Sequence, residues 1–456
     1  MSAFVHPDEI RSRFSAALSA MYRAEVPQYG DLLTLVADIN AQTLKADAGG
    51  ADRLAASGEL ARLSEERHGA IRLGTAAELA TISRLFAVMG MQPVGYYDLT
   101  PAGVPVHSTA FRAVHEHALQ TSPFRVFTSL LRLELIENPD LRAFAESALA
   151  KRSIFTAEAL ALIDQAETQG GLNASDAEAF IRQALETFRW HHTATVTGAQ
   201  YQQLSDQHRL IADVVAFKGP HINHLTPRTL DIDQVQAAMP GKGITPKAVI
   251  EGPPRRQCPI LLRQTSFKAL DESIAFTDAH GSHSARFGEI EQRGVALTPK
   301  GRALYDQLLN AARDELGTFP NEANAERYVQ LMEQHFHAFP DNYPQMREQG
   351  LAYFRYFVTD KGLAARGQVD QPRTLQTLVN AGHVAVEPLV YEDFLPVSAA
   401  GIFQSNLGDG AQGHYAGNSN RAAFEQALGR STIDELQLYE QTQQRSMDIC
   451  VETLLK

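Results

Sequence analysis

The stretch ERHGAIRLGT, residues 66–75, places two chemically capable side chains on one face of a predicted strand. Side chains alternate between the two faces of a strand, so His68 and Arg72 point the same way, with roughly 13 Å of extended chain between them. A metal ion at the histidine and a guanidinium at the arginine would suit a ligand charged at both ends. A surface strand with alternating charge explains the same pattern, so the stretch alone leaves both interpretations open.

The stretch FKGPHINHLTPRTLDID, residues 217–233, carries His221 and His224 beside an asparagine and between prolines. Proline and asparagine are typical of turns, so the two imidazoles can be incidental turn residues. Imidazole is also the commonest metal ligand among protein side chains. The local sequence favours a turn and leaves a metal-binding role open.

The stretch ARFGEIEQRG, residues 285–294, places Glu289 and Glu291 on one face of a predicted strand. Carboxylates within an apolar strand need partners, because burying an unpaired charge is costly. A metal ion would be one such partner, and Arg286 or Arg293 would be another.

Together the three stretches supply two histidines and one carboxylate from separate strands. This is the ligand set of a non-heme Fe(II) oxygenase, which keeps three positions open for substrate and oxygen, although Mn, Co or Ni accept similar ligands. His68 and His224 stand 156 residues apart, and Glu289 follows 65 residues later. No local motif covers such gaps, so spacing alone does not establish the site.

The composition limits the classes of partner. The chain has 456 residues, 44% hydrophobic and 21% charged, which is ordinary for a globular protein with a large core. A net charge of −12 disfavours a nucleic-acid scaffold but permits a small anionic substrate beside a local arginine. The sequence does not specify an oligomeric state.

The cysteines and the apolar runs indicate the cellular setting. Cys258 and Cys450 are the only cysteines, and no CxxC pair occurs, which excludes a zinc site built from thiolates. The opening MSAFVHPDEIRSRF carries acids and lacks the apolar run of a secretory signal. No stretch reaches the roughly 18 apolar residues that suggest a membrane span. We therefore expect a cytoplasmic protein with no membrane partner.

Strand segments are spread along the chain and helices fill the gaps between them, which favours an α+β fold around one central sheet. The segments expected to form the sheet are about 64–107, 214–298 and 384–410. The helical segments are two insertions at about 108–213 and 299–375 and a C-terminal helix at about 420–455.

The three chemical stretches belong to longer motifs that resemble one known family over essentially the whole chain. The other motifs are FRVFTSLLRLELI, ILLRQTSFKAL and YEDFLPVSAAGIFQSNLG. All of them look like the 2-oxoadipate dioxygenase/decarboxylase family, also called 2-hydroxyglutarate synthase. The resemblance implies a single catalytic unit over residues 1–456. Its core would be a twisted, mostly antiparallel sheet like that of the vicinal-oxygen-chelate fold.

The resemblance also implies an activity and a cofactor. Members of the family are Fe(2+) enzymes of lysine breakdown that convert 2-oxoadipate and O₂ to D-2-hydroxyglutarate and CO₂. The expected partners are therefore a small 2-oxo diacid and O₂. The reaction joins chelation of the 2-oxo acid by iron to oxidative decarboxylation and hydroxylation within the same molecule.

The metal ligands of the family fall on His68, His224 and Glu289, which would also contact the substrate. Glu291 is the alternative carboxylate, because it shares a strand face with Glu289. His221 is left as a neighbour of the site.

The substrate contacts of the family fall on Arg72 and Val397. Arg72 is expected to bind the distal carboxylate of the substrate and to serve catalysis by positioning it. Val397, in LPVSAA, is expected to contact the substrate, and Ser398 could add a backbone or hydroxyl contact.

Two alternative functions remain open at the level of sequence. A metal-dependent lyase or hydrolase acting on a 2-oxo diacid would use the same ligands without oxygen. The stretch GVALTPKGRALYDQLL, residues 294–309, resembles the wing-to-helix junction of winged-helix regulators, although the acidic charge argues against DNA binding. Oxygen uptake would distinguish the oxygenase from the lyase, and a gel shift would reveal the regulator.

Overall fold

The computed structural model describes residues 4–56, 58–267, 270–284, 286–318, 320–366, 374–395 and 418–455. The chain divides into two compact units, built from segments that alternate along the sequence. The first unit consists of Met1–Glu251, Gln264–Glu291 and Phe394–Ile433. The second consists of Gly252–Arg263, Gln292–Asp393 and Asp434–Lys456. The prediction that residues 1–456 act as a single catalytic unit stays a prediction.

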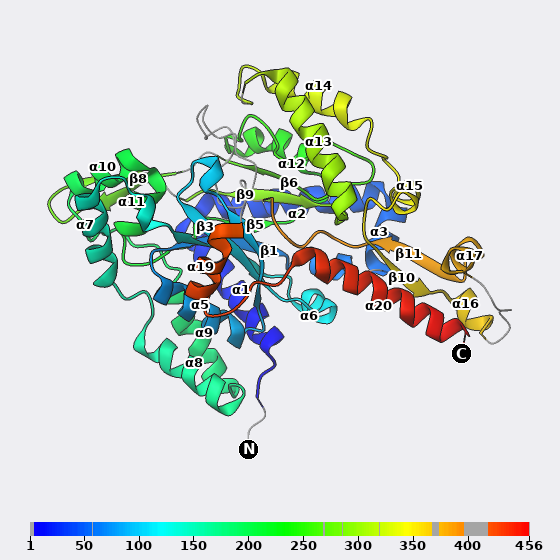
Figure 1. Ribbon diagram of the computed structural model, residues 1–456, viewed down its shortest axis with the longest axis horizontal. Helices are drawn as coiled ribbons and strands as arrows, with labels where there is room; N and C mark the ends of the chain where they lie inside the picture. The colour runs from blue at the N-terminus through cyan, green and yellow to red at the C-terminus, as the bar shows by residue number, and fades with distance from the viewer. Residues whose placement is uncertain are drawn as a thin grey trace. The chain divides into compact units, whose positions relative to one another are not determined.

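The strands lie in all the segments of the chain that were expected to contribute to a sheet (Figure 1). They are β1 Arg67–Leu73, β2 Gln92–Asp98, β3 Val106–Arg112, β4 Arg125–Leu131, β5 Leu225–Pro227, β6 Leu262–Ser266, β7 Asp271–Ala275, β8 His280–Ser284, β9 Glu289–Arg293, β10 Phe354–Val358 and β11 Val384–Pro388.

The helices account for most of the remaining described chain (Figure 1). Those up to residue 242 are α1 Pro7–Glu25, α2 Pro27–Ala46, α3 Ala48–Ala56, α4 Glu59–Arg62, α5 Ala76–Val88, η1 Thr100–Ala102, α6 Glu116–Thr121, η2 Leu133–Leu135, α7 Pro139–Ala150, α8 Ala157–Gln169, α9 Ala174–Glu186, α10 Gly198–Gln207, α11 Arg209–Val215, α12 Ile232–Ala238 and η3 Met239–Lys242. Those after residue 298 are α13 Pro299–Leu316, α14 Ala325–Phe336, α15 Tyr343–Glu348, α16 Asp360–Ala364, α17 Leu375–Asn380, α19 Asn418–Leu428 and α20 Glu435–Leu455.

A five-stranded sheet in the order β2-β3-β4-β1-β5 is the centre of the first unit. Its neighbouring strands run antiparallel except for β1 and β4, which are parallel. The predicted α+β class with a mostly antiparallel sheet is therefore confirmed. The likeness of this sheet to the vicinal-oxygen-chelate fold stays a prediction.

Strand β4 corrects the expectation of helices throughout 108–213. Its sequence RVFTSLL is buried at every position, because β3 and β1 flank it and both of its faces are covered. A strand buried on both faces loses the alternation of polar and apolar residues that identifies strands in a sequence. Strand β10, which lies within 299–375, likewise corrects the expectation of a helical insertion there, although it is only partly buried.

Helices α1, α2, α5 and α9 bury their apolar faces in one core together with β1 and β4. Phe14 of α1 packs edge-on against Phe124 and Phe188, with ring centroids 5.8 and 5.4 Å apart. Helix α5 begins directly after β1 with a capping box, in which the Thr75 hydroxyl accepts from the backbone N–H of Glu78. The helices thus pack against β1 and hold it in place.

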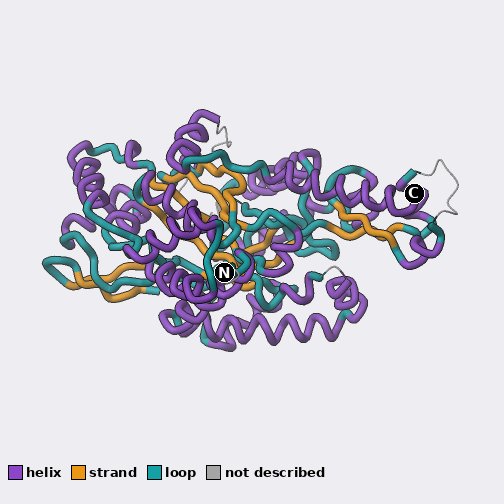
Figure 2. The backbone as a smooth tube through the Cα atoms, turned by 90° about the horizontal axis from the view of Figure 1, so that it is seen from below, coloured by secondary structure: helices purple, strands orange, loops and turns teal. Residues whose placement is uncertain are grey.

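In the second unit, β10 and β11 form an antiparallel ribbon alongside α20, as Figure 2 shows. Side chains of α20 bond to β10: Gln443 and Ser446 accept from the backbone N–H groups of Phe354 and Tyr356. The C-terminal helix expected at 420–455 is two helices. Gly429, at φ 78°, lies between α19 and α20 in a backbone conformation that favours glycine. No helix of the described chain combines the length and the apolar character that a membrane crossing needs.

Tyr22 of α1 joins two segments that lie far apart in the sequence. Its buried hydroxyl lies 3.0 Å from the carbonyl oxygen of Asn223 and 2.7 Å from that of Phe287. Asn223 directly precedes His224, and Phe287 stands two residues before Glu289. The backbone N–H of Phe287 also donates to the carbonyl oxygen of Asn223 at 3.1 Å, so the Tyr22 hydroxyl reinforces a direct link between the segments that carry two of the predicted metal ligands.

We predict that Tyr22→Phe destabilises the protein by about 1–3 kcal/mol, because a buried carbonyl loses its donor. Chemical denaturation followed by tryptophan fluorescence and circular dichroism measures the change. Tyr356→Phe, at a buried tyrosine of β10, is the matched control. Equal stability of the Tyr22 variant and the unmodified protein would contradict this role.

Candidate active site

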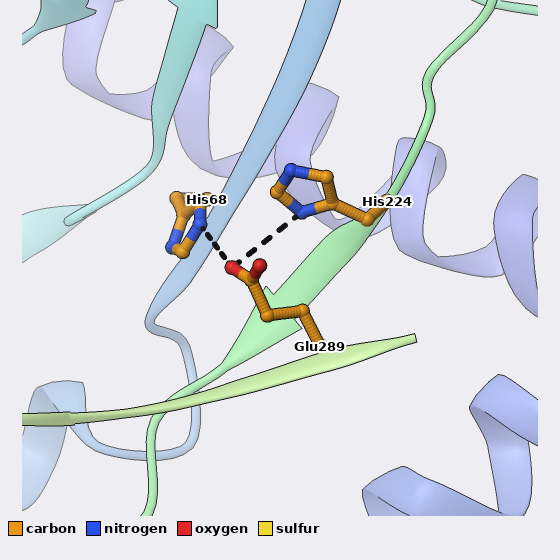
Figure 3. Close-up of side chains that lie close together, drawn as sticks. All are labelled: His68, His224 and Glu289. Carbon is orange, nitrogen blue, oxygen red and sulfur yellow. Dashed lines mark hydrogen bonds and ion pairs between the residues drawn. The ribbon is translucent and has the colours of Figure 1, made fainter. Parts of the chain in front are cut away.

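Three separate segments of the first unit bring His68, His224 and Glu289 together (Figure 3). His68 comes from β1, His224 directly precedes β5, and Glu289 begins β9. Pairing of His68 with Thr226 across β1 and β5 places the two histidines side by side. All three side chains are fully buried, and one donor atom from each lies within 4.8 Å of the others. The structure thus assembles the predicted set.

Glu289 Oε1 is the centre of this group. It lies 3.0 Å from His68 Nε2 and 3.8 Å from His224 Nδ1. The Gln264 amide donates to the same oxygen at 2.8 Å, and the Thr226 hydroxyl donates to it at 3.1 Å. The carboxylate is therefore held in one orientation by neutral donors.

The polar atoms of the group fit a metal ion. Glu289 Oε2 and His224 Nε2 are buried and have no hydrogen-bond partner among the described residues. Burial of polar atoms without partners is costly unless a further partner completes the site. A cation among these donors would satisfy them, and nitrogen and oxygen ligands suit iron and related metals.

The electrostatics of the histidines differ. Burial and the neighbouring charges of His68 and Arg72 hold the pKa of His224 well below its usual range, so its imidazole is neutral and able to bind a metal. Burial alone would lower the pKa of His68, but the charges of Glu291 and Glu289 outweigh it and raise that pKa. Burial raises the pKa of Glu289 despite the nearby imidazole of His68.

Glu291 occupies a different place from Glu289. Its Oε2 lies 2.9 Å from His68 Nδ1, an ion-pair distance at which the ring is not aligned for a hydrogen bond. Its Oε1 lies 3.6 Å from Arg125 Nη1. Arg125 in turn donates to Glu66 at 2.8 Å. Glu291 thus stands behind His68, on the opposite side of the ring from Glu289.

Arg72 leaves β1 on the same side as His68 and meets a second buried group. Its Nη1 donates to Asp213 Oδ2 at 2.7 Å. Asp213 also contacts His221 and His283, so His221 belongs to this second group and not to the first. The structure therefore separates the two histidines of the 217–233 stretch.

Aromatic rings enclose the first group. The ring of Phe287 stacks on His224 with centroids 4.8 Å apart, and Phe394 packs edge-on against His68 at 4.9 Å. Such walls lower the local dielectric and strengthen interactions among the polar atoms inside. The predicted substrate contacts Val397 and Ser398 lie outside the described residues.

Comparison with known proteins shows the family of the chain. The model of a family described as 2-oxoadipate dioxygenase/decarboxylase matches residues 14–406. A protein of that name from Pseudomonas putida is 68% identical over 454 residues, which cover 99% of this chain and 98% of the relative. The chain belongs to the 2-oxoadipate dioxygenase/decarboxylase family.

Other members of the family are similar along their whole length. A 2-oxoadipate dioxygenase/decarboxylase of Escherichia coli is 56% identical over 451 residues, 99% of each chain. The crystal structure of hydroxyglutarate synthase from Pseudomonas putida, in complex with 2-oxoadipate, shares 66% identity, covers 100% of both chains and has a TM-score of 0.94. The predicted family is confirmed, and the chain is an oxidoreductase.

Sequence reasoning missed Asp213, Thr226 and Gln264. Asp213 lies within the apolar run LIADVVAF, where a lone carboxylate is itself a signal, because it must find a partner when buried. Thr226 follows His224 at the alternation of a strand, so its side chain returns to the same face. Gln264 carries no signal of its own in the sequence.

Gly69, between His68 and Ala70, lies where β1 and the segment before β5 approach closely. A Cβ atom at this position would lie 2.5 Å from Ile222 Cδ1 and 3.2 Å from the carbonyl oxygen of His224. The first distance is too short for two non-bonded carbon atoms, so the buried Ile222 side chain would have to shift. Glycine therefore allows the two histidine-bearing segments to pair.

We predict that Gly69→Ala destabilises the protein by about 1–3 kcal/mol, because the added methyl group displaces the buried Ile222 side chain and crowds the carbonyl oxygen of His224. Gly241→Ala is the matched control, since no atom lies within 4 Å of a Cβ at that position. Thermal unfolding of both variants measures the difference. A Gly69 variant no less stable than the Gly241 variant would contradict the close approach.

Proposed function

We propose that this chain is an Fe(II)-dependent enzyme that converts 2-oxoadipate and O₂ to D-2-hydroxyglutarate and CO₂. The observation that carries the proposal is the buried group of His68, His224 and Glu289, in which Glu289 Oε2 and His224 Nε2 lack hydrogen-bond partners among the described residues. The names of the relatives support the substrate and the reaction, and the hydroxyglutarate synthase of known structure binds 2-oxoadipate.

His68, His224 and Glu289 would hold the iron. A metal ion held there would supply open coordination positions for the 2-oxo acid and for O₂, and the redox chemistry that activates O₂. Gln264 and Thr226 keep the Glu289 carboxylate in place, and Glu291 restrains the His68 ring. Partners behind the ligands orient them and adjust their affinity for the metal.

Arg72 would bind the distal carboxylate of the substrate. It stands four residues after His68 on the same strand face, so β1 presents a proposed metal ligand and a guanidinium on one side, as a ligand charged at both ends requires. Guanidinium and carboxylate pair through two parallel hydrogen bonds, which fixes direction as well as distance. Arg72 thereby positions the methylene group that is to be hydroxylated. Val397 completes the proposed set of substrate contacts.

The overall reaction balances with the substrate and O₂ alone. The C1 carboxylate leaves as CO₂, and the former keto carbon becomes a carboxylate with one new oxygen atom. The adjacent methylene gains the second oxygen atom as a hydroxyl. No separate 2-oxo acid is consumed, because the substrate carries its own. The phenyl walls of Phe287 and Phe394 keep bulk water from the reacting atoms.

The direct test is anaerobic loading with Fe(II), addition of 2-oxoadipate and then admission of air. The proposal expects CO₂, 2-hydroxyglutarate and oxygen consumption in equal amounts. Release of CO₂ under nitrogen would favour a metal-dependent lyase. A chiral separation of the product tests the D configuration. A cytoplasmic location belongs to the same proposal and is supported by the two free cysteines.

The two glutamates of β9 should differ in their effect on metal binding. We predict that Glu289→Ala abolishes stoichiometric Fe(II) binding, whereas Glu291→Gln weakens it by about 10- to 100-fold because only the support of His68 is lost. Anaerobic Fe(II) titration measures both. The reverse order of the two effects would assign the ligand to Glu291.

Arg72 should affect substrate binding and not metal binding. We predict that Arg72→Ala retains bound iron yet loses roughly 100-fold in kcat/KM for 2-oxoadipate, because a buried charge pair with the substrate is lost. Arg72→Lys should recover only part of the loss, since an ammonium lacks the planar fork. Steady-state kinetics and metal analysis measure these effects, and unchanged kinetics would remove the assigned role.

A further inference from the structure

A second group of two histidines and one carboxylate lies in the first unit. Asp213 of α11, His221 before β5 and His283 of β8 are all buried, and one donor atom from each lies within 4.8 Å of the others. Like the predicted metal ligands, the group consists of two histidines and one carboxylate. Its contacts, however, indicate a different task.

The polar atoms of the second group are already partnered. Asp213 Oδ2 accepts from Arg72 at 2.7 Å, and Oδ1 lies 2.9 Å from His283 Nε2 and 3.2 Å from His221 Nε2. The other nitrogen of His283 lies 2.7 Å from the Tyr201 hydroxyl. No buried side-chain nitrogen or oxygen of Asp213, His221 or His283 lacks a hydrogen-bond partner, in contrast to the first group.

The charge next to Asp213 also disfavours a metal ion. The guanidinium of Arg72 already supplies a positive charge to the carboxylate. A divalent cation among the same three residues would be repelled by that guanidinium and would have to displace it. Two imidazoles and one guanidinium around a single carboxylate form a complete arrangement without a metal.

Aromatic packing makes the second group rigid. The ring of Trp190 packs edge-on against His221, with centroids 4.6 Å apart, and Phe217 lies 4.7 Å from His283. Arg286 covers the outer face of Trp190 at 4.5 Å. Rings held on several sides cannot change rotamer freely, so Asp213 is presented to Arg72 in one position.

Asn223 connects the second group to the first. In the amide orientation that satisfies both of its polar atoms, its side-chain oxygen accepts from Arg72 Nη1 at 3.0 Å and from His221 Nε2 at 3.2 Å. Its amide nitrogen then donates to the carbonyl oxygen of Ala70. Asn223, which accepts from Arg72, is bonded directly to His224, a predicted metal ligand.

We propose that Asp213, held by His221 and His283, is a positioning residue that fixes the Arg72 guanidinium and so determines the preference for a 2-oxo acid with a distal carboxylate. The proposal rests on the proposed function, because it assumes that Arg72 binds that carboxylate. It assigns the second group an anchoring role and no metal.

Two effects oppose each other at Asp213. Its negative charge competes with the substrate for Arg72, so its removal strengthens the attraction between Arg72 and any anion. Its hydrogen bond fixes the direction of the guanidinium, and loss of that direction breaks the two-bond pairing with a carboxylate. The second effect dominates, because catalysis needs the reacting methylene held within a fraction of an ångström.

The test compares two substrates of equal chain length, 2-oxoadipate and 2-oxohexanoate, which lacks the distal carboxylate. In Asp213→Asn the ratio of kcat/KM for 2-oxoadipate over 2-oxohexanoate is expected to fall about tenfold, equivalent to about 1.4 kcal/mol. Asp164→Asn is the matched control, since Asp164 also pairs with an arginine, Arg84, at an exposed position. An unchanged or raised ratio in the Asp213 variant overturns the proposal.

A double-mutant cycle separates positioning from general stability. If Asp213 acts through Arg72, Asp213→Asn causes no further loss for 2-oxoadipate in the Arg72→Ala background. Additive losses overturn the proposal. Tyr201→Phe, which removes only the outermost hydrogen bond, should lower the ratio in the same direction by about two- to threefold if Asp213→Asn fails to fold.

Metal stoichiometry distinguishes the remaining outcomes. One Fe(II) per chain in both the unmodified protein and Asp213→Asn supports the anchor. Two per chain, reduced to one by Asp213→Asn, would make the second group a metal site and overturn the proposal. Failure of the unmodified, iron-loaded enzyme to consume oxygen with 2-oxoadipate would instead contradict the proposed function.

Discussion

Burial of ionisable side chains without water is the constraint on which this site depends. His68, His224 and Glu289 are fully buried, and a charge in such surroundings must be paired or its pKa must shift. The first unit meets this demand with neutral donors to Glu289, a carboxylate behind His68 and a lowered pKa at His224. Glu289 Oε2 and His224 Nε2 have no hydrogen-bond partner among the described residues, and a bound cation would complete the site.

The same constraint gives different tasks to two groups that each contain two histidines and one carboxylate. In the Glu289 group, Glu289 Oε2 and His224 Nε2 lack hydrogen-bond partners among the described residues and can bind a cation. In the Asp213 group, the guanidinium of Arg72 already pairs with the carboxylate. A count of ligands is therefore insufficient to recognise a metal site. Whether each potential ligand atom already has a hydrogen-bond partner identifies a metal site better, because a metal ion takes the place of such a partner.

The sequence named the candidate ligands that the structure brings together, and it predicted the fold class but not every strand. Alternation along β1 placed His68 and Arg72 correctly on one side, and family motifs identified the remaining candidates. The alternation of side chains along a strand could not decide between Glu289 and Glu291, because residues two apart share a strand face. Only the neighbouring strands show which carboxylate lies beside both histidines. Strand β4 escaped detection because burial on both faces removes alternation. Asp213 was missed because its partners come from distant elements.

Anomalous diffraction at the iron edge tests the central claim most directly. Crystals loaded anaerobically with Fe(II) should show one strong peak among His68, His224 and Glu289 and none beside Asp213. That result would confirm that unsatisfied donors, and not ligand composition, mark the metal site. A peak beside Asp213, or none at Glu289, would contradict the account.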